Sequence, residues 1–137
     1  MYLLDTVVLS ELRKARRQHN VVRWLGERRP AELFVSVITL GEIERGIAKQ
    51  ESINPQFAQR LTQWLEHTVS AYQERILPVT AAVARRWGRM TIEFGRTDAD
   101  LFIAATAAEH GLCVVTRNAR HFQDTGIDVV DPFASLE

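Results

Sequence analysis

The sequence predicts an α/β protein in which helices cover both faces of a central parallel sheet of about four to five strands. Short apolar runs rich in β-branched residues alternate along the chain with longer segments of helical periodicity. Each run is separated from the next by enough residues for a crossover helix. The 137 residues, 46% hydrophobic and 25% charged, fit one globular domain covering residues 1–137.

The first half of the chain contains two predicted strands, at residues 2–4 and 33–38, which are apolar and bounded by polar residues. Helical spacing of apolar side chains predicts helices over residues 7–17, 20–28, 39–50 and a long segment after Asn54 and Pro55. Thr39 and Glu42 have the spacing of a capping box and predict the start of the third of these helices.

The second half continues the alternation. Strands are predicted at 76–79, 112–115 and 127–130, with a short turn containing Asn118 before the last. Thr80 is expected to cap a helix that reaches Gly95, and Thr97 to cap one over 98–110 that stops at Gly111.

Polar side chains gather where the predicted strands end. In an open parallel sheet, ligands bind beyond the carboxyl ends of the strands. We therefore expect one cluster at this edge, drawn from four segments of the chain: Asp5, Glu42, Asp98, Asp100, Thr116 and Asn118.

Clustered carboxylates repel one another, and a divalent cation removes this conflict. Mg²⁺ prefers oxygen ligands, and a bound ion can activate water and stabilise charge in phosphodiester hydrolysis. Each acid also has an ordinary structural explanation. Glu42 fits the capping box of Thr39, Asp100 stands three residues after Thr97, and Asp98 would complement a helix dipole.

Four segments resemble toxins of the PIN-domain family, of the VapC and FitB kind. They are the opening YLLDTVVLSEL, the segment VSVITLGEIERG, the run DLFIAATA, and VVTRN followed by Phe122. The C-terminal VVDPF also fits, so the resemblance extends over nearly the whole chain.

This resemblance implies a three-layer α/β/α sandwich and an endoribonuclease that depends on Mg²⁺ or Mn²⁺. It implies that Asp5, Glu42 and Asp100 are the catalytic, metal-binding carboxylates. Thr6 and Thr116 match supporting hydroxyl positions, and Asn118 matches the polar residue that ends the fourth strand. The implied partners are RNA, a second copy of the chain, and a cognate antitoxin through which the complex binds promoter DNA.

Two positions depart from the family pattern. Val7 stands where relatives carry a small polar residue, and His121 stands where they carry an aspartate, which puts a second metal ion in question. We expect His121 to be a surface histidine, with Asp98 a weak substitute for the missing charge. An alternative function is a PIN-like binding or regulatory module with impaired catalysis. A phosphotransfer domain is disfavoured because Val7 replaces its second aspartate.

The 17 basic and 17 acidic residues give zero net charge, so RNA binding would need local charge separation. Two basic groups could form a phosphate-binding rim: Arg13, Lys14, Arg16 and Arg17, and separately Arg85, Arg86 and Arg89. The N-terminal residues lack the features of a signal peptide, no apolar stretch is long enough for a membrane span, and Cys113 has no internal disulfide partner. These features predict a cytoplasmic protein.

Overall fold

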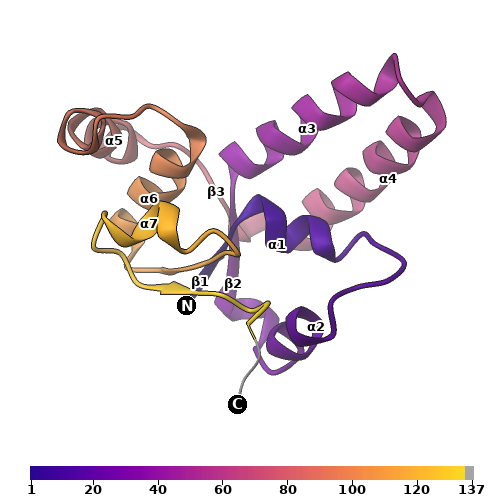
Figure 1. The fold of residues 1–137 in the computed structure, drawn as a ribbon, viewed down its shortest axis with the longest axis horizontal. Helices are drawn as coiled ribbons and strands as arrows, with labels where there is room; N and C mark the ends of the chain where they lie inside the picture. The colour runs from indigo at the N-terminus through magenta and orange to yellow at the C-terminus, as the bar shows by residue number, and fades with distance from the viewer. Residues whose placement is uncertain (135–137) are drawn as a thin grey trace.

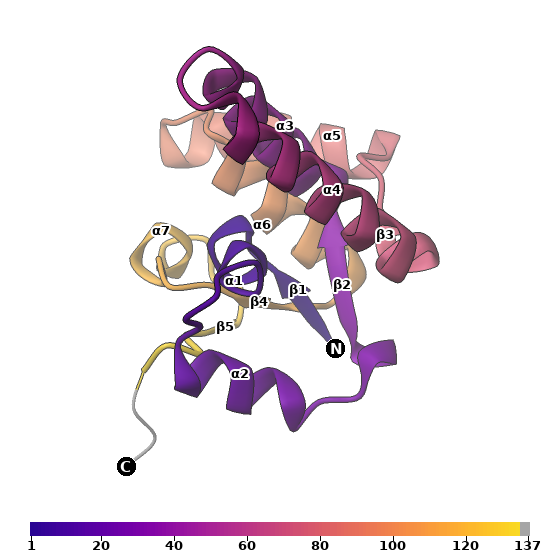
Figure 2. The ribbon, with the colours of Figure 1, turned by 90° about the vertical axis from the view of Figure 1, so that its right-hand side faces the viewer.

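The computed structural model describes residues 1–134. Within this part of the chain five parallel strands form one sheet with the order β3-β2-β1-β4-β5, and all five are labelled in Figure 2, beside the view of Figure 1. The strands are β1 (Tyr2–Leu4), β2 (Leu33–Ser36), β3 (Ile76–Leu77), β4 (Cys113–Val115) and β5 (Val129–Val130). The helices are α1 (Thr6–Glu11), α2 (His19–Gly26), α3 (Val37–Glu51), α4 (Pro55–Tyr72), α5 (Ala81–Phe94), α6 (Ala99–His110) and α7 (Arg120–Gln123).

The first strand of the chain lies at the centre of the sheet. Tyr2 pairs with Leu33 of β2 on one side and with Cys113 of β4 on the other. The ladder to β4 continues one residue past β1, where the amide of Asp5 donates to the carbonyl of Val115 at 2.9 Å. Strand β1 therefore places Asp5 at the middle of the carboxyl edge.

Alternate residues of the strands enter two separate hydrophobic cores, as a period of two requires. Leu3 and Val114 face a core completed by α5, α6 and α7, whereas Leu4 and Val115 face a core completed by α1 to α4. Figures 1 and 2 show the consequence: α3 and α4 run side by side away from the sheet, with α5 and α6 forming the other layer. The three-layer α/β/α prediction is confirmed.

The predicted start of α3 is wrong. The helix begins at Val37, directly after β2, and Ser36 caps it by accepting a hydrogen bond from the amide of Ile38 at 3.0 Å. With no loop between strand and helix, the last strand residue supplies the cap. Thr39 is thus a fully buried helical residue and forms no capping box with Glu42.

Helix α6 also starts at a different residue from the one predicted. Asp98, rather than Thr97, is its N-cap and accepts from the amide of Leu101 at 3.1 Å. A carboxylate caps a helix at least as well as a hydroxyl, so the stronger of two adjacent candidates took the position. Asp100 therefore lies in the first turn and does not pair with Thr97.

Other boundaries also differ from the sequence prediction: β2 ends at Ser36, β3 ends at Leu77 and β5 begins at Val129, so these strands are shorter than predicted. Helix α1 ends at Glu11, so the basic run 13–17 lies outside it, where like charges do not face each other across a helical turn. The turn expected near Asn118 leads into α7, a single helical turn that the sequence analysis missed. No helix within residues 1–134 combines the length and the apolar character needed to cross a membrane.

Candidate functional site

Asp5 forms the centre of the candidate site. It is 4% exposed, and its two carboxylate oxygens are held from different directions. The amide of Thr6 donates to Oδ1 at 2.8 Å, and Thr116 Oγ1 donates to Oδ2 at 2.7 Å. Thr116 directly follows β4 and is completely buried, and its oxygen also accepts from the amide of Asn118 at 3.0 Å. Two central strands thus fix one carboxylate.

Glu42 reaches this edge from the second turn of α3. Thr6 Oγ1 donates to Glu42 Oε1 at 2.5 Å and lies 3.3 Å from Thr39 Oγ1. Thr6 therefore connects the two acids, with its amide on Asp5 and its hydroxyl on Glu42. These contacts replace the capping role that the sequence allowed for Glu42.

Asp100 is the third carboxylate. Its Oδ2 lies 2.8 Å from Nδ1 of His121 on α7. The side chain of His121 is 60% exposed, as expected of a surface histidine, but it contacts the candidate site. Arg96 joins these elements from the other side, because its guanidinium donates to the carbonyl of His121 and lies 3.3 Å from Asp98.

The carboxylates repel one another in this arrangement. The pKa of Asp5 rises from 3.8 to about 6, mainly because burial disfavours the charged form, and the charges of Asp100 and Glu42 raise it further. The hydrogen bonds from Thr116 and Thr6 act in the opposite direction. A partly protonated carboxyl near neutral pH, facing two other acids, is a group that a cation would stabilise.

The oxygen-rich donor set suits a hard divalent cation. Among residues 1–134, however, no three His, Cys, Asp or Glu side chains lie close enough together to ligate a single ion directly. Mg²⁺ commonly keeps several waters and takes only one or two carboxylates, so the set fits such an ion without three direct protein ligands.

The remaining predicted residues occupy different places. Asp98 serves as the cap of α6, and the exposed Asn118 contacts Thr116 through its backbone amide. Of the first basic group, Arg13 lines a groove of about 250 Å³ that also contains Thr6 and Glu42. The same groove is lined by residues of α3 and α4: Ile43, Gly46, Gln50, Phe57, Leu61 and Trp64.

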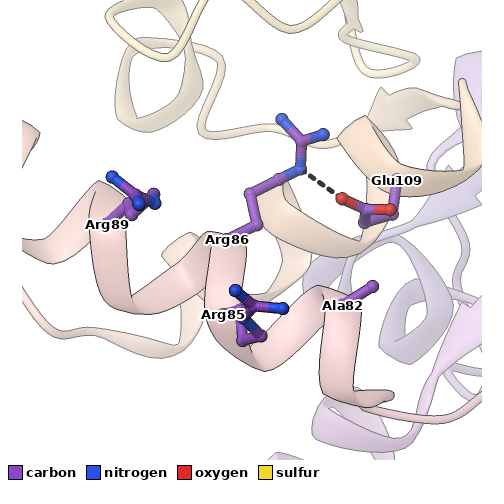
Figure 3. A pocket seen from close by; sticks show the side chains of 5 residues that line it. All are labelled: Ala82, Arg85, Arg86, Arg89 and Glu109. Carbon is purple, nitrogen blue, oxygen red and sulfur yellow. Dashed lines mark hydrogen bonds and ion pairs between the residues drawn. The ribbon is translucent and has the colours of Figure 1, made fainter.

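The second basic group is separate from the acids. Arg85, Arg86 and Arg89 project from one face of α5, and Arg86 Nε donates to Glu109 of α6 at 2.8 Å (Figure 3). None of the three candidate carboxylates lines this pocket. Trp24 is 5% exposed and Trp87 stacks on Phe102, so both contribute to packing.

Sequence analysis missed the basic loop after β4. Arg117 and Arg120 line a cavity of about 410 Å³ together with Asn118 and His121, next to the Asp100 side of the site. The guanidinium of Arg117 lies over the ring of Phe133 at 4.3 Å. The signal was the basic composition of the TRNARH segment, with three cationic or titratable residues in six positions.

A model of the PIN domain matches residues 2–127. The chain belongs to the PIN domain family. This PIN domain is 32% identical to VapC ribonuclease Y4jK of Sinorhizobium fredii, with 97% of the chain and 98% of the relative covered. It is 31% identical to Toxin FitB of Neisseria gonorrhoeae, with 97% and 99% covered.

Solved structures share the architecture of this PIN domain. The crystal structure of FitAcB from Neisseria gonorrhoeae matches with a TM-score of 0.85 and 32% identity, over 97% of this chain and 99% of that one. DNA-bound VapBC from Salmonella typhimurium matches with a TM-score of 0.75 and 28% identity, over 96% and 97%. The family resemblance that the sequence motifs indicated is confirmed.

Proposed function

We propose that this PIN domain is an endoribonuclease and the toxin of a type II toxin–antitoxin module. Its relatives include a protein named as a VapC ribonuclease and one named as a FitB toxin, each matched over almost its full length. The observation that carries the proposal is the position of Asp5, a buried carboxylate at the centre of the carboxyl edge whose pKa is raised to about 6 beside two further acids.

Asp5, Asp100 and Glu42 would hold Mg²⁺ or Mn²⁺, partly through water. When bound, such an ion supplies an activated water and stabilises the charge that develops on the phosphate. The chain's own residues keep the carboxylates in place. Thr116 and Thr6 fix Asp5 through two hydrogen bonds, and the Thr6 hydroxyl orients Glu42.

The RNA strand would lie across the three carboxylates, with a group of basic side chains, a basic rim, on each side of them. Arg13 stands on the groove side that contains Glu42, and Arg117 and Arg120 stand on the α7 side near Asp100. Both rims are exposed, so a flexible strand of RNA can reach them. The zero net charge of the whole chain is compatible with this because acids and bases are separated locally.

An antitoxin would be the second partner. The groove between α1, α3 and α4 has apolar walls from Phe57, Leu61 and Trp64 and an acidic end at Glu42. It therefore suits a peptide segment with apolar side chains and an arginine that pairs with the carboxylates. Structures of relatives in complexes bound to DNA support a larger assembly that binds promoter DNA through the antitoxin. We also propose a homodimer and a cytoplasmic location.

A second candidate is a PIN-like binding module with impaired catalysis. Val7 favours it, since a half-buried valine that packs in the core supplies no hydrogen bond beside Asp5.

The deciding experiment is RNA cleavage by purified protein freed of antitoxin, on total tRNA and ribosomal RNA with Mg²⁺, Mn²⁺ or a chelator. We expect discrete fragments that require the metal and disappear with Asp5→Asn. Asp128→Asn is the matched control, because it removes an exposed carboxylate just before β5 and should leave cleavage unchanged. Absence of cleavage by folded wild-type protein with either metal would favour the binding module.

A further inference from the structure

We infer that His121 is a direct ligand of the metal ion that Asp100 binds, and that this nitrogen donor makes the site prefer Mn²⁺ over Mg²⁺. The inference deepens the proposed function, because it assigns the native ion of the same site. It concerns a residue that the sequence analysis expected to be an ordinary surface histidine.

The spacing of the two side chains carries the inference. His121 Nδ1 lies 2.8 Å from Asp100 Oδ2. In an octahedral complex with bonds of about 2.1 Å, two donors at a right angle lie about 3 Å apart. The pair therefore has nearly the separation of two neighbouring ligands on one ion. Binding would replace the hydrogen bond between them, with the His121 ring turning so that the Nδ1 lone pair faces the ion.

The backbone of His121 is held from three directions. Its amide donates to the carbonyl of Asn118 at 2.9 Å, and its own carbonyl accepts from the guanidinium of Arg96. The next residue, Phe122, is completely buried in the core that α5 and α6 share with the sheet. A ligand on a fixed backbone loses little conformational freedom when the ion binds.

The ring itself is accessible. The His121 side chain is 60% exposed and that of Asp100 is 20% exposed, so an ion and its waters can reach the pair from solvent. A neutral imidazole carries one hydrogen, and when this sits on Nε2 the lone pair of Nδ1 is free for the ion. The carboxylate of Asp5 lies close enough to interact electrostatically with that of Asp100, so it adds a second acidic group that attracts a cation.

The choice of ion follows from the donor type. Mg²⁺ is bound through oxygen and demands nearly ideal octahedral geometry, so a nitrogen ligand suits it poorly. Manganese is held in proteins by mixed sets of carboxylates and histidines. An aspartate at position 121 would make all the protein ligands oxygen atoms, and the preference for Mn²⁺ over Mg²⁺ would be lost.

Pulsed EPR of Mn²⁺ bound to the protein tests the inference without RNA. We expect coupling between the Mn²⁺ electron spin and an imidazole nitrogen in the wild type, lost in His121→Asp and retained in His67→Gln, which changes an exposed histidine on α4. Titrations with Mn²⁺, and its displacement by Mg²⁺, should show Mn²⁺ affinity falling roughly tenfold or more in His121→Ala. The ratio of Mn²⁺ to Mg²⁺ affinity should fall by a similar factor in His121→Asp.

Three outcomes would overturn the inference: no nitrogen coupling in the wild type, an unchanged affinity ratio in His121→Asp, or tighter Mn²⁺ binding in His121→Ala. The last would show that the histidine competes with the ion for Asp100. If the protein cleaves RNA but shows no nitrogen coupling, the proposed function stands and the assignment of His121 as a metal ligand is wrong. If nitrogen coupling is present but no RNA is cleaved, His121 is a metal ligand and the proposed nuclease activity is wrong.

Discussion

At the scale of single residues, Asp5 combines a structural cost with the proposed chemistry. The carboxylate is almost completely buried and faces two other acids, so its ionised form is disfavoured in the folded protein. Thr116 and the amide of Thr6 offset part of this cost. Residues placed for function commonly reduce stability in this way.

Asp5→Asn should therefore stabilise the metal-free protein at neutral pH. The folded-state pKa of about 6 lies above the reference value of 3.8, so the folded protein keeps a proton that the unfolded chain loses. The wild type thus loses stability as the pH rises through this window, by at most about 3 kcal/mol. The neutral amide does not titrate, and its oxygen and nitrogen can still bond to Thr6 and Thr116.

Urea unfolding in the presence of a chelator, from pH 4 to pH 8, measures this effect. The free energy of unfolding of Asp5→Asn should exceed that of the wild type by an amount that grows as the pH rises. At the acidic end of the range the two proteins should not show this difference. Added Mg²⁺ or Mn²⁺ should stabilise the wild type and not the mutant. A mutant that is equally destabilised at every pH would show that the carboxylate is needed for packing alone.

Asp5 and Glu42 could be predicted from the sequence because they follow strand ends, which are visible as boundaries of apolar runs, and Asp100 because it lies in the first turn of a helix with clear start signals. Their contacts could not. Thr6 and Glu42 are 36 residues apart, and Asp100 and His121 are 21 apart. No local pattern reports that a hydroxyl or an imidazole will face a particular carboxylate, so Thr39 and His121 were assigned other roles.

At the scale of helices, the start of α6 determines where Asp100 points. Asp98 accepts from the amide of Leu101 and lies 3.3 Å from Arg96, so it fixes the first turn that carries Asp100. We assign Asp98 this capping role, in preference to a place among the metal-binding groups.

Asp98→Ala should reduce the free energy of unfolding by about 1 kcal/mol, the usual cost of losing an N-cap. Asp98→Asn keeps the acceptor and should lose much less. Both are measured by urea unfolding, with Mn²⁺ affinity determined in parallel. An affinity loss of tenfold or more in Asp98→Asn, at full stability, would place this carboxylate among the metal-binding groups instead.

The longer helices and their order could be predicted from the periodicity of apolar residues. The residues at which several helices begin or end could not. The start of α3 was misplaced because Ser36 and Thr39 are both good caps, and the choice depends on where β2 leaves the sheet. Helix α1 was extended too far because the basic run 13–17 is also what suits the C-terminal end of a helix, whereas the helix ends at Glu11. The single turn of α7 is too short for periodicity to reveal, and the burial of Phe122 holds it in place.

At the scale of the whole molecule, the charges cancel in sum and separate in space. Acids occupy the carboxyl edge of the sheet, and Arg13, Arg117 and Arg120 stand on either side of it. If three phosphates of a single strand contact these residues, the logarithm of RNA affinity should fall with the logarithm of salt with a slope of about −2.

Measurements with Asp5→Asn, which we expect to bind RNA without cleaving it, would give this slope between about 50 and 200 mM salt. Each of Arg13→Gln, Arg117→Gln and Arg120→Gln should reduce its magnitude by about 0.7. Lys49→Gln changes an exposed lysine of α3 that lines neither cavity, so it is the matched control and should leave the slope unchanged. Affinity that does not vary with salt would exclude phosphate contacts on these rims.

The central position of β1 also affects when the protein can become active during synthesis. Asp5 is synthesised before its hydrogen-bond partner Thr116, which lies 111 positions later in the chain. Chains grow from the N-terminus, so β1 cannot pair with β4 until all the elements between these two strands have been made. The proposed ribonuclease would therefore lie beside ribosomal RNA with its central carboxylate still unsupported, and it would acquire a complete site only after β4 and Thr116 have been made.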